Sequence, residues 1–98
     1  MTTQMRKYTI KKGKMGEFVK AWMDTVYPLR LEHGFTVDYA GILEDTDDFI
    51  CLISSSDRDD WETKESAYYA SDGHALLEPI VAPHISGGET WFVESVIA

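Results

Sequence analysis

Cysteine, basic residues and long apolar runs are all scarce in this sequence. Its single cysteine, Cys51, cannot form an internal disulfide, and no apolar stretch reaches the length of a secretory signal or a membrane-spanning helix. Seventeen acidic residues against nine basic ones give a formal net charge of −8, which repels phosphate backbones and anionic lipid surfaces. We therefore expect a cytoplasmic protein that binds neither nucleic acid nor membranes.

Motifs for metal ions, nucleotides and other cofactors are also absent. The three histidines, His33, His74 and His84, lie far apart in the sequence, and no His-x-x-x-His or clustered Cys/His spacing occurs. The acidic group 44–48 lacks the longer ladder of oxygens, the glycine and the terminal glutamate of a calcium loop. Glycine-rich phosphate-binding patterns are missing as well. The sequence therefore predicts no metal site and no bound cofactor.

The composition is that of a globular protein with a core. Hydrophobic residues make up 44% of the 98 positions and aromatic residues 12%, so the chain has enough apolar surface to fold despite its charge. A chain of this length fits one domain, which we expect to span residues 1–98.

Two kinds of hydrophobic periodicity alternate along the chain. Apolar residues recur every three or four positions between Met15 and Val26, which is typical of one stripe of a helix, and Gly34 is suited to close that helix in the left-handed conformation. Pro28 predicts a kink near residues 25–27. Alternating or short apolar runs predict strands. The expected elements are a strand over 5–11, a helix over 14–33, strands over 35–43 and 49–54, a helix that begins after Ser56 or Asp57, a short helical turn over 75–81 and a strand over 89–97.

The order strand, helix, strand, strand, helix, strand is the split βαβ plan (βαββαβ) of a ferredoxin-like α+β fold. Such a fold places two helices on one face of a four-stranded antiparallel sheet and leaves the other face bare. The strand over 49–54 is apolar on both sides, with Phe49, Cys51 and Ile53 on one and Ile50 and Leu52 on the other. Because no further helix is left to cover the second face, we expect a homodimer that packs sheet on sheet.

Four short segments carry a resemblance to a known family. They are RKYTIKKGK at 6–14, followed by EF at 17–18; YPLR at 27–30, followed by HGF at 33–35; DDFI at 47–50; and YY at 68–69. In this order and spacing the chain resembles the NIPSNAP family of the dimeric α/β barrel superfamily. The resemblance implies a ferredoxin-like fold, a dimer and a ligand pocket between each sheet and its own helices, as is frequent in the superfamily, but the family supplies no agreed reaction.

Aromatic residues whose positions point toward such a pocket are the candidate ligand-binding side chains. Trp22 and Trp61 fall on helical stripes, where large aromatic residues commonly pack in a core, whereas a buried tyrosine needs a hydrogen-bond partner that a pocket could supply. The ligand-binding candidates are Tyr8, Trp22, Tyr27, Tyr39, Trp61, Tyr68 and Tyr69.

Three residues are candidates for catalysis. Arg30 and His33 lie one turn apart at the end of the first helix, where they would either bind a carboxylate or enolate or cap the helix. His74 lies at a position similar to the histidine of the antibiotic-monooxygenase relatives, where it would transfer protons near neutral pH, or else it is a solvated loop residue. The absence of asparagine from the sequence argues against haem degradation in the manner of relatives that use an Asn, Trp and His set.

Three functions remain open from the sequence. The first is a homodimeric NIPSNAP-like protein of unassigned activity that binds a small, partly apolar molecule between helices and sheet. The second is a cofactor-independent monooxygenase or isomerase acting on an aromatic or enolisable substrate, with His74 or His33 as base and Arg30 as anion holder. The third is a non-catalytic assembly module whose own side chains fill the pocket. A cavity with a polar lining favours the first two, and close packing around Trp22 and Trp61 favours the third.

Overall fold

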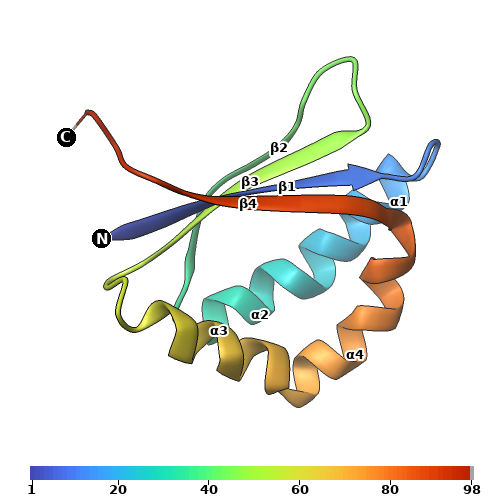
Figure 1. Ribbon diagram of the computed structural model, residues 1–98. Coiled ribbons are helices and arrows are strands. Elements are labelled where there is room, and N and C mark those ends of the chain that lie inside the picture. Colours follow the sequence, from blue (N-terminus) through green and yellow to red (C-terminus); the bar gives the residue numbers. More distant parts are fainter. Residues whose placement is uncertain (98) are drawn as a thin grey trace.

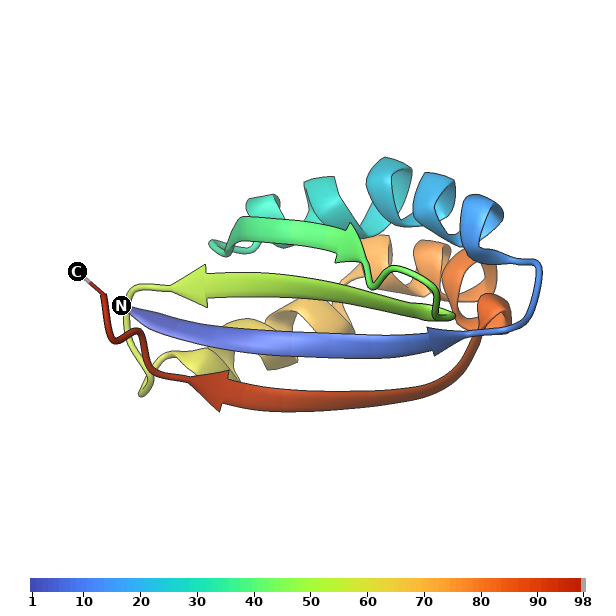
Figure 2. The same ribbon diagram turned by 90° about the horizontal axis from the view of Figure 1, so that it is seen from above.

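A computed structural model describes residues 1–97 as a four-stranded antiparallel sheet with helices on one face (Figure 1). The strands lie side by side in the order β2-β3-β1-β4 (Figure 2), which is the ferredoxin-like α+β arrangement expected from the sequence. The elements are β1 (Thr2–Ile10), α1 (Met15–Ala21), a π-helical turn η1 (Trp22–Val26), α2 (Tyr27–Glu32), β2 (Thr36–Ile42), β3 (Asp48–Ser55), α3 (Trp61–Ala70), α4 (Asp72–Val81), a 3-10 turn η2 (Ala82–His84) and β4 (Ile85–Val93).

The first helix runs from α1 through η1 into α2 and contains an irregularity where Pro28 predicted one. Over residues 22–26 the helix widens into a π turn, in which the backbone N–H of Tyr27 donates to the carbonyl of Trp22. Because a proline has no N–H to donate, the irregularity falls where the α-helical ladder is interrupted in any case. Gly34, with φ at 84°, closes the helix in the left-handed region as expected.

The second helical region, which consists of α3 and α4, is longer than the sequence indicated. Before α3, the Asp57 carboxylate accepts a backbone N–H two residues on, so Asp57 caps a turn that precedes the helix. α4 begins already at Asp72, because Ser71 Oγ accepts the N–H of His74 at 3.1 Å and caps the helix. The helical turn expected over 75–81 was therefore too short. No helix among residues 1–97, in either helical region, is long and apolar enough to cross a membrane.

β4 begins and ends four residues earlier than the expected range 89–97. Gly87 and Gly88, which looked like a turn in the sequence, pair with Thr9 and Tyr8 of β1. A Cβ atom on Gly88 would lie 3.2 Å from Cδ1 of Tyr8. The glycine therefore keeps this stretch of strand open for the Tyr8 ring, which is why a residue type that weakens strands is found inside one.

A β-bulge in β2 reverses the direction of one candidate side chain. The register between β2 and β3 shifts between Val37 and Tyr39. Val37 pairs with Ile53, which is buried beneath the helices, whereas Tyr39 pairs with Leu52 on the opposite face and is 53% exposed. Simple alternation had placed Val37 and Tyr39 on one face, and the extra residue at the bulge separates them.

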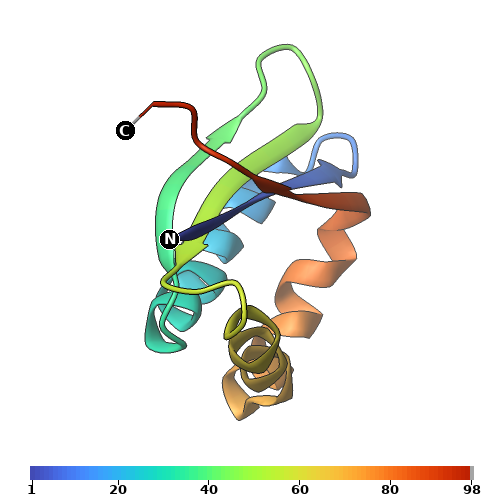
Figure 3. The same cartoon turned by 60° about the vertical axis from the view of Figure 1, so that its left-hand side comes forward.

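The core lies between the helices and the inner face of the sheet, and all the helices lie on this one side (Figure 3). β3 contributes Phe49, Cys51 and Ile53 to it, as the alternation predicted. Phe18 on the first helix packs edge-on against Phe49, with ring centroids 5.1 Å apart. This packing fixes the first helix over the centre of the sheet.

The outer face of the sheet is not covered by any element within residues 1–97 (Figure 3). Its strands nevertheless present apolar side chains to solvent. Trp91 and Val93 of β4 are 40% and 42% exposed, and Ile50 and Leu52 of β3, on the other side of β1, are half-buried. The apolar character of both faces of β3, expected from the sequence, is thus present in the structure.

Candidate functional site

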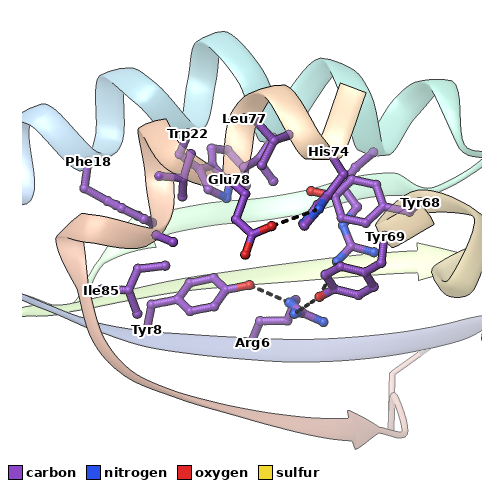
Figure 4. Close-up of a pocket in the computed structure, with 14 residues that line it drawn as sticks. Arg6, Tyr8, Phe18, Trp22, Tyr68, Tyr69, His74, Leu77, Glu78 and Ile85 are labelled. Carbon is purple, nitrogen blue, oxygen red and sulfur yellow. Dashed lines mark hydrogen bonds and ion pairs between the residues drawn. The ribbon is translucent and has the colours of Figure 1, made fainter. Parts of the chain in front are cut away.

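A cavity of about 250 Å³ lies between the inner face of the sheet and the helices (Figure 4). Its walls come from β1, the first helix, α3, α4 and the start of β4, which are far apart in the sequence. One end is polar and is formed mainly by arginine and tyrosine side chains, and the other end is apolar (Figure 4). The lining residues are Arg6, Tyr8, Phe18, Trp22, Val26, Arg30, Tyr68, Tyr69, His74, Leu77, Glu78, Val81, Ala82 and Ile85.

Arg6 organises the polar end from the centre of the sheet, where it faces inward and is 8% exposed. Its Nε donates to Tyr8 Oη at 2.7 Å, its Nη1 to Gln4 Oε1 at 2.7 Å and to Glu65 Oε1 at 3.1 Å, and its Nη2 to Tyr69 Oη at 3.0 Å. All three guanidinium nitrogens therefore have acceptors. This cation is held in one position and serves as the framework of the site.

Arg30 reaches the same cluster from α2 but is held differently. Its guanidinium stacks on the Tyr68 ring with Cζ 3.8 Å from the centroid, and the residue is 3% exposed. Nη2 lies 3.5 Å from Glu65 Oε1 and 3.5 Å from Tyr69 Oη, while Nη1 is buried without a hydrogen-bond partner among residues 1–97. The side chain therefore enters the cluster and does not cap the end of its own helix.

Glu65 on α3 is the one carboxylate that pairs with either arginine within residues 1–97. Its Oε1 faces both guanidinium groups, and its Oε2 accepts the indole N–H of Trp61 at 3.2 Å. Two positive charges thus share one negative charge in a largely buried cluster. An uncompensated buried charge is unfavourable, so the cluster would be stabilised by an anion.

Two of the tyrosines stay protonated at neutral pH. Burial raises the pKa of Tyr68 to about 12. Burial also raises the pKa of Tyr8, although the neighbouring Arg6 guanidinium opposes this effect. Both phenols are therefore neutral hydroxyl groups that can donate a hydrogen bond to a molecule in the cavity.

His74 lines the cavity from the first turn of α4. Its ring packs edge-on against Tyr68 and Tyr69, with centroids 5.1 Å and 4.8 Å apart. Nδ1 lies 4.0 Å from Oε2 of Glu78, whose side chain is 64% exposed. A partly buried imidazole beside a solvated carboxylate is suited to exchange protons between solvent and a bound molecule.

The apolar end is formed by side chains from the first helix, α4 and β4. Phe18 is fully buried, and Trp22 is 3% exposed. Tyr27 stacks behind Trp22 with ring centroids 5.7 Å apart and planes 7° from parallel. Ile85 completes this end beside the Tyr8 ring, and Leu77 lies next to Trp22 on the helical side of the cavity (Figure 4). Such a wall accepts an apolar group and offers it no hydrogen bond.

Six of the ten residues proposed from the sequence line this cavity, and they come from five different elements. They meet because the inner face of β1 and the inward stripes of the helices share one space. The six are Tyr8, Trp22, Arg30, Tyr68, Tyr69 and His74.

The other four, Tyr27, His33, Tyr39 and Trp61, lie outside the lining of the cavity. Tyr39 is on the opposite face of the sheet because of the bulge in β2. Trp61 is 2% exposed and supports Glu65 from behind. His33 packs edge-on against Tyr68 at a centroid distance of 5.8 Å and does not reach the cavity.

Three polar residues of the site, Arg6, Glu65 and Glu78, are not among the candidates predicted from the sequence. Arg6 precedes Tyr8 by two positions, and alternation in a strand places both on one face. Glu65 and Glu78 follow Trp61 and His74 by four positions, which places each pair together on a helix. These spacings were the available signal for the cluster.

Residues 1–97 provide neither a cluster of metal ligands nor a reactive thiol. Residues 1–97 contain no group of three or more His, Cys, Asp or Glu side chains placed to hold a metal ion. Cys51 is buried in the core, and burial raises the pKa of its thiol to about 11. The thiol is therefore protonated at neutral pH and poorly reactive.

Comparison of the chain with known proteins defines its class at the level of the fold. No family profile matches the chain, and no curated protein matches its sequence. A solved structure of an uncharacterized NIPSNAP domain protein from Burkholderia xenovorans is similar to it with a TM-score of 0.90 at 18% identity, covering 100% of this chain and 98% of that chain. The fold and site thus define a ferredoxin-like α+β protein with the architecture of NIPSNAP domain proteins.

Two further solved structures show a similar fold. A NIPSNAP family protein with unknown function from Agrobacterium tumefaciens has a TM-score of 0.90 at 16% identity, covering 97% of this chain and 87% of that chain. An antibiotic biosynthesis monooxygenase has a TM-score of 0.74 at 16% identity, covering 98% and 99% of the two chains. The NIPSNAP likeness seen in the sequence is therefore confirmed in the fold, which is shared more distantly with a monooxygenase.

Proposed function

We propose that this protein binds a small, partly apolar molecule in the cavity between its helices and its sheet. The observation that carries the proposal is the union of an apolar end and a polar end in one cavity, which is the usual composition of a ligand site. The volume of about 250 Å³ is just below the ~300–1,000 Å³ of typical ligand pockets, so the ligand is small. Because side chains leave this space open, ligand binding is better supported than a purely structural assembly module.

Calorimetric titration with small aromatic compounds tests this proposal. Replacing Val26, which lines the cavity, by Phe should fill part of the space and weaken the binding of every ligand. Met23→Phe is the matched control, because Met23 is on the same helical turn but is 47% exposed and outside the cavity lining. Equal binding by the two variants would contradict the proposal, and so would a wild-type protein that binds none of the compounds.

A cofactor-independent monooxygenase or isomerase is the second candidate function. His74 and Arg30 line the same cavity, and an antibiotic biosynthesis monooxygenase has a similar fold. In this function Arg30 would hold the enolate or carboxylate of an aromatic or enolisable substrate, and His74 would take its proton.

Proton exchange measures the abstraction of a substrate proton, which is the step assigned to His74 in this function. Exchange of the α-protons of phenylpyruvate for deuterium, followed by NMR, should be accelerated by the wild-type protein and lost in His74→Ala at an unchanged melting temperature. Equal acceleration by wild type and variant would remove His74 from the reaction.

The homodimer expected from the sequence is part of the proposal. The apolar outer face, which includes the exposed side chains of Tyr39, Trp91 and Val93, supports it, because a second copy packed face to face would remove these groups from water. Sedimentation equilibrium at micromolar concentration tests it, and a stable monomer would contradict it.

A cytoplasmic location also belongs to the proposal. It is supported by the one cysteine of the sequence, Cys51, which is a buried free thiol of the kind that a reducing compartment preserves. Fractionation of cells that express the protein would test this location.

A further inference from the structure

The polar end of the cavity is rich in hydrogen-bond donors and poor in acceptors. Tyr8 Oη accepts from Arg6 Nε, and Tyr69 Oη accepts from both guanidinium groups, so the protons of these two hydroxyls are left to donate elsewhere. Arg30 Nη1 is buried and has no hydrogen-bond partner within residues 1–97. Three donors are therefore gathered at the polar end of the cavity without an acceptor among these residues.

The polar end of the cavity also has a surplus of positive charge, which favours the same kind of ligand as its surplus of hydrogen-bond donors. Arg30 is 3% exposed and shares its single carboxylate partner, Glu65, with Arg6. Glu78 contributes a carboxylate to the cavity lining, but its side chain is 64% exposed and lies beside His74, so solvent screens its charge. The cluster therefore retains an excess of positive charge inside a protein whose formal net charge is −8.

We infer that the ligand of this cavity is a small organic carboxylate with a short apolar body, whose carboxylate is bound by Arg30 and by the hydroxyls of Tyr8 and Tyr69. This inference rests on the proposed function and adds the chemical class of the ligand. A carboxylate supplies the acceptors that these three donors lack and the negative charge that the second guanidinium lacks. The apolar body lies toward Phe18 and Ile85, at the end of the cavity opposite the arginines (Figure 4).

Access to Arg30 is through the side chain of Tyr69. Its hydroxyl is positioned where an anionic oxygen would lie, 3.0 Å from Arg6 Nη2 and 3.5 Å from Arg30 Nη2. The residue is 46% exposed, so its ring has room to turn toward solvent. A carboxylate that enters would take over the contact with Arg30 and accept a hydrogen bond from the Tyr69 hydroxyl.

The test uses four benzene derivatives of similar size on the wild-type protein: the anion benzoate, the neutral benzamide and benzyl alcohol, and the cation benzylamine. Calorimetry should show benzoate binding at least about tenfold more tightly than benzamide, because a charge-assisted pair replaces a neutral one, and benzylamine should not bind. Benzamide or benzyl alcohol binding as tightly as benzoate would overturn the inference and leave the proposed function standing. Failure of all four probes to bind would overturn both.

Two variants test whether Arg30 is responsible for the preference for benzoate over benzamide. Arg30→Gln should bring benzoate down to the affinity of benzamide, whereas Arg58→Gln, the same change at an exposed arginine outside the cavity lining, should keep the tenfold difference. Preserved discrimination in Arg30→Gln would overturn the assignment. If circular dichroism shows that Arg30→Gln does not fold, Arg30→Lys takes its place in the test. This variant keeps the charge but loses the planar guanidinium group, so it should lose part of the preference for benzoate.

Discussion

Arg6 and Arg30 donate toward the same oxygen of Glu65, from 3.1 Å and 3.5 Å, but only Arg6 has an acceptor for every guanidinium nitrogen. The two arginines therefore have different roles. Arg6 ties β1 to α3 through Glu65, whereas Arg30 carries the charge that the cluster does not balance. A stability comparison of the two positions separates a structural cation from a binding one.

The first prediction follows from this difference. Arg6→Met should destabilise the fold by about 3–5 kcal/mol, because it leaves Glu65 and the polar groups around it without their main partner. Arg30→Met should cost less than ~1 kcal/mol or stabilise the protein, since the Arg6–Glu65 pair stays intact and an uncompensated charge is removed. Urea unfolding measures both values. A cost at position 30 equal to that at position 6 would contradict the division of roles.

The second prediction concerns the glycines of β4. Gly88→Val should displace the Tyr8 ring, whose Cδ1 lies 3.2 Å from a Cβ at this position, and should weaken benzoate binding several-fold. Gly87→Val is the matched control, because nothing lies within 4 Å of a Cβ there. Calorimetric titration of both variants is the measurement, and equal affinities would show that Gly88 does not position Tyr8.

The third prediction is a loss of stability at alkaline pH. The pKa of Cys51 is raised from 9.0 to about 11 and that of Tyr68 from 10.0 to about 12, both by burial. The folded state keeps protons that the unfolded state has lost, so stability should fall as pH rises from 9.0 to about 11 for the thiol and from 10.0 to about 12 for the phenol.

Urea midpoints across this pH range measure the effect. Cys51→Ala should flatten the lower part of the decline and leave the upper part, which belongs to the buried tyrosines Tyr68 and Tyr8. A stability that is constant from neutral pH to about 12 would rule out buried, protonated groups at these positions.

The fourth prediction tests the outer face of the sheet as a dimer interface. Leu52→Glu places a charge at the centre of the apolar face and should halve the mass measured by light scattering without unfolding the monomer. Leu76→Glu is the control, since Leu76 is 75% exposed on α4, on the helical side of the molecule. A Leu52→Glu protein that keeps the mass of the wild type would place the interface elsewhere.

The fold could be predicted from the sequence because its signals are local. The three-and-four spacing through Phe18 and Trp22 indicates an inward helix stripe, and the short apolar run of β3 indicates a strand that is apolar on both faces. The errors arose where tertiary contacts override local preference. Gly88 lies in a strand because the Tyr8 ring needs the space, and Tyr39 faces outward because a bulge adds one residue to β2.

The site was predicted in part for a related reason. Residue type and period identified Tyr8, Trp22 and Arg30 as candidates for one pocket, and the structure brings them to one cavity. The charge balance of the cluster could not be read from the sequence. It depends on Arg6 and Glu65 meeting across 59 positions of chain and on the direction of each guanidinium fork.

The π turn η1 determines whether the protein has a second cationic side chain in its cavity at all. On a straight α-helix, Arg30 would be rotated roughly 120° from Phe18, because each residue adds about 100°. A π turn contains about one more residue per turn than an α-helix, so it offsets most of this rotation. Arg30 therefore lies on the inward stripe. In evolutionary terms, the insertion or deletion of a single residue in this helix would rotate the arginine into or out of the cavity. A surface arginine could thus become a binding residue without any substitution.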